Sequence, residues 1–128
     1  MFLNILLKLF LKDHERQMIT IYDLKDDAKK LYAFYKKGLE IRGKTFEMEG
    51  LEHDLIDDIQ RFIKRHSKFR HFMFKGLNRK LSTAITQLQE LRKPEPQFKK
   101  GKVINTDEYI QYYGDKCLIF DAIVDVLS

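Results

Sequence analysis

Apolar residues recur along most of this chain with the spacing of an α-helix. Across residues 51–91 they return every three or four positions, and residues 24–39 and 110–127 show the same period. Six glycines and two prolines in 128 residues leave long windows without a helix breaker. The pattern predicts an all-α fold, an antiparallel helical bundle of three long or four shorter helices, with a short N-terminal apolar helix.

Local signals set the expected helix ends. Thr20 to Asp23 has the form of a capping box, so a helix is expected to start there. It is expected to pass through Gly38, at a cost of about 1 kcal/mol, and to stop at Gly43. Two prolines from Pro94 onward then open a loop, and Asn105 or Thr106 is expected to cap the last helix.

Residues 51–92 allow two interpretations. Their continuous apolar phase favours one helix of about 40 residues, roughly 60 Å long. The usual length of helices, and Arg70 in the middle of the apolar sector, favour two helices broken near Ser67 or Gly76. We favour the broken form. An unbroken helix would leave an apolar seam that predicts a homodimer.

Length and composition fit one helical-bundle domain, residues 20–128, preceded by an N-terminal apolar segment, residues 1–19. That segment holds Lys8, is about half the length that spans a bilayer and lacks the features of a signal peptide, so no transmembrane segment is expected. It is expected to dock on its own domain, with a membrane surface or a partner groove as alternatives. The single cysteine, Cys117, cannot form an intramolecular disulfide, and a cytoplasmic location is expected.

Charge is distributed unevenly. Residues 45–60 hold six acids and no lysine or arginine, whereas residues 61–80 hold eight lysines or arginines and no acid. On a continuous helix most of these cations share a sector of roughly 100°, and Phe72 lies among them. A stripe of this kind indicates an anionic partner, although acids of the protein itself provide a structural alternative.

The leading hypothesis is a non-enzymatic basic binding module whose favoured partner is nucleic acid. The alternative is a protein-binding adaptor, inhibitor or immunity-type protein that meets an acidic protein surface. The lysines near residue 100 are expected to extend the same patch, and Phe72 to stack on an unpaired base. The candidate binding residues are Arg61, Lys64, Arg65, Lys68, Phe72, Lys75, Arg79, Lys80, Lys99, Lys100 and Lys102.

Arg61 and His66 have the arginine, four residues, histidine spacing that resembles the HEPN ribonucleases, which are also helical bundles. The resemblance implies an arginine that stabilises phosphate charge and a histidine that transfers protons. Phe62, however, replaces the family's usual polar residue. The two side chains would also lie about 140° apart on a regular helix, with His66 on the apolar face. We therefore expect a packed histidine and no nuclease activity.

Other candidate sites are weaker. The acidic run around Glu52, His53 and Asp57 lacks a second Glu-x-x-His element, so a solvated face is expected rather than a metal site. Cys117 lies on an apolar helix and is expected to be a small core residue. No cofactor is expected.

Overall fold

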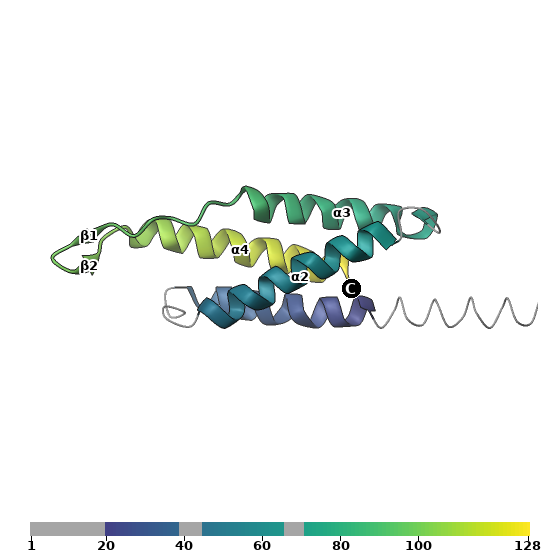
Figure 1. The fold of residues 1–128 in the computed structure, drawn as a ribbon, viewed down its shortest axis with the longest axis horizontal. Helices are drawn as coiled ribbons and strands as arrows, with labels where there is room; N and C mark the ends of the chain where they lie inside the picture. Colours follow the sequence, from purple (N-terminus) through teal and green to yellow (C-terminus); the bar gives the residue numbers. More distant parts are fainter. Residues whose placement is uncertain (1–19, 39–44, 66–70) are drawn as a thin grey trace, which may run out of the picture.

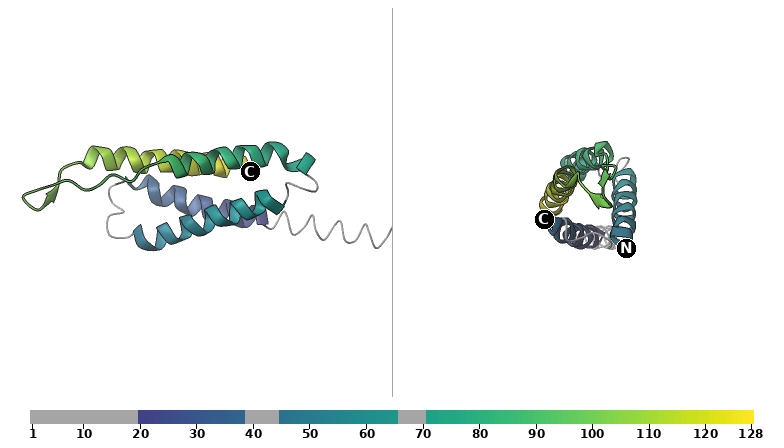
Figure 2. Two further views of the ribbon diagram at one scale, coloured as in Figure 1. Left: turned by 45° about the horizontal axis from the view of Figure 1, so that its top comes forward. Right: turned by 90° about the vertical axis from the view of Figure 1, so that its left-hand side faces the viewer.

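The structure is a computed structural model, and it describes residues 20–38, 45–65 and 71–128. Its helices are helix 20–36, α2 (Thr45–Arg65), α3 (His71–Glu90) and α4 (Thr106–Val126), and the short strands β1 (Phe98–Lys99) and β2 (Lys102–Val103) lie between α3 and α4. Successive helices run in opposite directions and surround a common centre (Figures 1 and 2). The predicted all-α antiparallel bundle is confirmed, in its four-helix form.

The core follows the apolar period of each helix. Each of the four described helices contributes fully buried side chains. In α2 and α3 the buried residues follow the apolar period that the sequence shows across residues 51–91. Acids in the first turn of α4 and cations in the last turn of α2 match the direction of each helix dipole. The largest fully buried side chains are Phe120, Leu31, Leu55, Ile59, Leu81 and Ile123.

Residues 51–92 do not form one helix. α2 ends at Arg65 and α3 begins at His71, and the two helices then run antiparallel (Figure 2). The favoured broken form is confirmed, and the single long helix is wrong. The seam that motivated a homodimer is instead covered inside the bundle, where Leu55 and Ile59 of α2 join Leu81 of α3 in one core.

Gly38 ends the first helix rather than lying within it. Helical structure stops at residue 36, and Gly38 has φ +61°, the left-handed conformation that glycine adopts most readily. The expectation that the helix continues through Gly38 was therefore wrong, and Gly43 lies outside the described residues. Thr20, the expected cap, is already helical.

The expected loop after Pro94 contains a β-hairpin that the sequence pattern did not predict. Phe98 pairs with Val103 and Lys99 with Lys102, in an antiparallel register. Lys100 and Gly101 at the tip both have positive φ, 52° and 78°, as the two central residues of a type I′ turn do. Strands of two residues are too short to give a readable alternating pattern. The hairpin projects beyond the N-terminal end of α4 (Figure 1).

Asn105 anchors the base of this hairpin. Its Oδ1 accepts a hydrogen bond from the backbone N–H of Gln97 at 2.9 Å, and its Nδ2 donates to the carbonyl of Glu95 at 2.8 Å and to Glu108 at 3.1 Å. The N–H of Ile104 also donates to the carbonyl of Gln97 at 2.8 Å. Asn105 is the N-cap residue of α4 by position, as predicted, but its side chain holds the hairpin instead of capping the helix.

Asn105→Ala should release the hairpin while the bundle stays folded. The variant loses bonds to Gln97, Glu95 and Glu108, and we expect a cost of about 1–3 kcal/mol, as for other part-buried polar groups that lose a partner. Hydrogen exchange should accelerate at the amides of Gln97 and Ile104 and stay unchanged at the helix core. Equal protection in both proteins would contradict the anchoring role.

None of the helices in the described ranges combines the length and the apolarity that crossing a bilayer requires. The N-terminal segment, residues 1–19, lies outside those ranges, so its expected docking stays a prediction.

Candidate functional site

The break between α2 and α3 divides the cations that the sequence pattern placed on one stripe. Arg61 and Arg65 line a cavity of about 240 Å³ between α2 and helix 20–36, together with Asp23, Asp27 and Asp58. Arg61 lies 4.0 Å from Asp58. Burial raises the pKa of Asp27, and the neighbouring carboxylates raise it further. Acids of the protein itself therefore line the same cavity as these two arginines.

The remaining cations of this region have other surroundings. Lys64 lines a separate groove between α2 and α3 with Ser82, Thr86 and Gln89. Lys64 and Arg65 also occupy the last turn of α2, where the helix dipole favours cations, so their placement has a structural reason.

Five more candidates lie on or before α3. Arg79 and Lys80 are exposed. Lys68 lies outside the described residues, and for Phe72 and Lys75 the structure describes the backbone of α3 alone. The single continuous stripe predicted for residues 61–79 does not form, because it required one unbroken helix.

Lys99, Lys100 and Lys102 do not extend that region. They belong to the hairpin, which lies at one end of the bundle, whereas the C-terminal end of α2 and the N-terminal end of α3 lie at the other (Figures 1 and 2). The predicted extension of the patch is therefore wrong. The three lysines form a separate basic site, which we call the hairpin site together with Phe98.

The hairpin site combines lysines that form no ion pair among the described residues with an exposed aromatic ring. Lys99 and Lys102 are directly paired across the two strands, an arrangement in which like charges repel. Across the described ranges, no ion pair joins either of them, or Lys100, to an acid. Phe98 is 64% exposed and enters none of the ring contacts found among the described residues.

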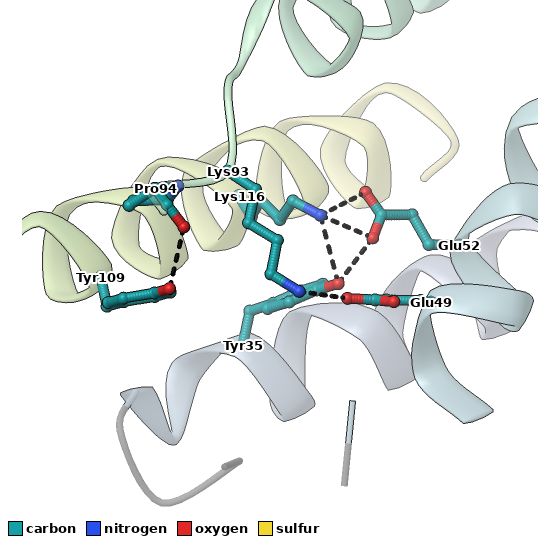
Figure 3. Close-up of polar contacts among 7 residues, drawn as sticks. All are labelled: Tyr35, Glu49, Glu52, Lys93, Pro94, Tyr109 and Lys116. Atoms are coloured by element: carbon teal, nitrogen blue, oxygen red, sulfur yellow. Dashed lines mark hydrogen bonds and ion pairs between the residues drawn. The ribbon is translucent and has the colours of Figure 1, made fainter. Parts of the chain in front are cut away.

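A second polar arrangement lies inside the bundle, where three helices meet. Lys116 of α4 donates hydrogen bonds to both carboxylate oxygens of Glu52 of α2, at 2.8 and 2.9 Å (Figure 3). The hydroxyl of Tyr35, from helix 20–36, also donates to Glu52. The ammonium lies 4.9 Å from the ring centroids of Tyr35 and Tyr112. Lys116 and Glu52 are each only 8% exposed.

The electrostatics of this buried cluster keep Lys116 and Tyr35 protonated near neutral pH. Burial alone would lower the pKa of Lys116, but the Glu52 carboxylate outweighs that effect and the pKa is raised. Burial and the hydrogen bond to Glu52 raise the pKa of Tyr35 far above its usual range. Because the pKa of Lys116 is raised on folding, the protonated ammonium of Lys116 stabilises the fold fully below pH about 10.5, and this contribution is lost as the pH rises further. Neither group is poised as a base or nucleophile near neutral pH.

A shallower pair lies beside this cluster (Figure 3). Lys93, just after α3, contacts Glu49 of α2 at 3.2 Å, with about half of each side chain exposed. The hydroxyl of Tyr109 donates to the carbonyl of Pro94 at 2.8 Å. These two contacts fix the chain that leaves α3 against α2 and α4.

Among the residues that the structure describes, the other chemical candidates form no catalytic or metal-binding cluster. His66 lies outside the described residues, so its expected burial stays a prediction. His53 and Asp57 form a surface pair at 3.6 Å, and within the described part of the chain no three metal-ligating side chains cluster. Cys117 is half-buried, and burial raises the pKa of its thiol, which disfavours the reactive thiolate.

Sequence reasoning missed three of these residues. Glu52 was assigned to a solvated acidic face, and that assignment is wrong because Glu52 is buried against Lys116. A signal was present, since Lys116 follows Tyr113 by three positions and precedes Phe120 by four, the spacing of the buried face of α4. Phe98 was not among the predicted binding residues, yet it is exposed and precedes Lys99 and Lys100 directly.

Comparison with known protein families, curated proteins and solved structures finds no match to this chain, so its function is argued from its own residues and their geometry.

Proposed function

We propose that the protein is a non-enzymatic nucleic-acid-binding module that contacts its partner through the hairpin site. The observation that carries the proposal is the set of lysines at positions 99, 100 and 102, which project from the bundle with no acid answering them among the described residues. Phosphate groups along a nucleic acid would relieve the repulsion between Lys99 and Lys102.

The rigidity of the hairpin base supports the proposal. Asn105, which follows β2, holds the segment that leads into β1 against the start of α4, so the hairpin is anchored at its base. A scaffold that is already ordered loses less conformational entropy on binding. The overall charge of +5 supports attraction of a polyanion at longer range.

The proposal assigns the protein no reaction. Lys116 and Tyr35 have their pKa values raised and are buried, and burial raises the pKa of the Cys117 thiol. These groups therefore stay protonated near neutral pH and support a structural role better than a catalytic one. The exposed lysines suit recognition of charge, which needs no activated group.

Replacing Lys99, Lys100 and Lys102 with Gln should weaken binding to labelled 20-nucleotide RNA and DNA, measured by fluorescence anisotropy over a range of salt concentrations. If the three lysines contact phosphates of a single strand, the slope of log affinity against log salt should fall by about 2. Stability should change little, because the lysines are exposed and unpaired.

The matched control replaces Lys29, Lys30 and Lys37 of the first helix and its end with Gln. These lysines are also exposed, so both variants lose the same charge from the surface. The control should keep most of the wild-type affinity. Equal losses in the two variants would mean that net charge alone drives binding. No binding by the wild-type protein would reject nucleic acid and leave an acidic protein surface as the partner to test.

A further inference from the structure

The hairpin site presents different chemistry on its two faces. Side chains alternate along a strand, and directly paired residues share a face. The register therefore places Phe98 and Val103 on one face and Lys99 and Lys102 on the other, with Lys100 at the tip. One face of the ribbon is apolar, and the other face and the tip are cationic.

The exposed ring of Phe98 would be matched best by a partner with a flat surface. Within a duplex the bases stack on each other and present only their edges in the grooves. Bases of a single strand leave their π faces free, and such bases commonly stack on exposed aromatic side chains. Phe98 is 64% exposed, and none of the described rings packs on it, so its face is open to a base.

The division into two faces also favours a flexible ligand. A duplex is stiff over about 150 base pairs, so it would meet either Phe98 or the paired lysines, but not both. A single strand bends around a tip of two residues. It can place one base on Phe98 while its neighbouring phosphates reach Lys100 and the cationic face.

We propose that the hairpin binds single-stranded nucleic acid, with one base stacked on the ring of Phe98 and the adjacent phosphates held by Lys99, Lys100 and Lys102. This inference rests on the proposed function and narrows it to single strands. Stacking on a phenyl ring uses no edge of the base, so little sequence preference is expected.

The test compares three ligands: a 12-nucleotide oligothymidine, an abasic strand of the same length, and a 12-base-pair duplex. The wild-type protein should bind oligothymidine more tightly than either of the others at equal salt. Phe98→Ala should weaken binding to oligothymidine by roughly five- to 150-fold. It should leave affinity for the abasic strand and for the duplex unchanged, along with the salt dependence.

Two controls keep the result interpretable. Phe98→Tyr retains the ring and should retain the affinity. Tyr22→Ala removes an aromatic ring that is 58% exposed on the first helix and should have no effect. Hydrogen exchange at Ile104 reports whether the hairpin of each variant stays folded.

The possible failures are distinguishable. Equal affinity for single strand and duplex, with no effect of Phe98→Ala but a loss in the variant that lacks the three lysines, would overturn the stacking inference and leave the proposed function standing. Tighter binding to the duplex would do the same. A wild-type protein that binds none of the three ligands would overturn both.

Discussion

Lys116→Met should destabilise the protein by about 3–5 kcal/mol, the usual cost of removing one partner from a buried ion pair. The variant would leave the carboxylate of Glu52 inside the bundle with only the hydroxyl of Tyr35 as its described partner. Methionine fills most of the same volume, so the loss reports the missing charge rather than a cavity. Urea unfolding followed by circular dichroism measures the difference.

Lys93→Met is the matched control for this prediction. Lys93 also pairs with a glutamate of α2, but about half of its side chain is exposed, and such pairs contribute about 0–1 kcal/mol. A second variant, Glu52→Gln combined with Lys116→Met, should recover most of the lost stability because no buried charge remains. If Lys116→Met costs no more than Lys93→Met, water reaches Glu52 and the pair is not buried in solution.

Phe120→Ala should cost about 3–5 kcal/mol, as expected for a large aromatic side chain removed from a packed core. Phe120 is fully buried, and its ring lies almost parallel to that of Tyr35, with 5.8 Å between centroids. The truncation removes that contact and leaves a cavity at the centre of the bundle. Thermal and urea unfolding should both show the loss.

Leu118→Ala on the same helix serves as the control for Phe120→Ala. Leu118 is 69% exposed, so its truncation should change stability by only about 0.5 kcal/mol. Similar losses at positions 118 and 120 would mean that α4 is rotated relative to the structure. The effects of Phe120→Ala and Lys116→Met should not add simply, because both side chains contact Tyr35.

The sequence pattern was sufficient for the parts of the fold that depend on helical period. The apolar period across residues 51–91 includes Leu55, Ile59 and Phe62 of α2, and Leu81 and Leu88 of α3, and all five are buried. The period did not locate the break between α2 and α3, because the apolar phase on either side happens to match. Only helix length and Arg70 indicated that the run was interrupted.

The features that the sequence pattern missed depend on contacts between distant segments. Lys116 and Glu52 are 64 positions apart in the sequence. Each is a charged residue of the kind usually found at the surface, and only the fold shows that the two are paired in the interior. The hairpin depends on Asn105, which the pattern identified as a helix cap and which instead binds Glu95 and Gln97. The positive φ of Lys100 could not be predicted from the sequence either, because lysine rarely adopts this conformation.

The connection between α3 and α4 is longer than the fold requires, and the proposed binding residues lie in its extra length. Residues 91–105 join these neighbouring antiparallel helices, whereas helix connections in bundles commonly need about two to eight residues. The hairpin, residues 98–103, contributes no member to the buried core. Its composition is therefore free to change without altering the stability of the bundle, and the tip offers a position for grafting other binding sequences onto the same scaffold.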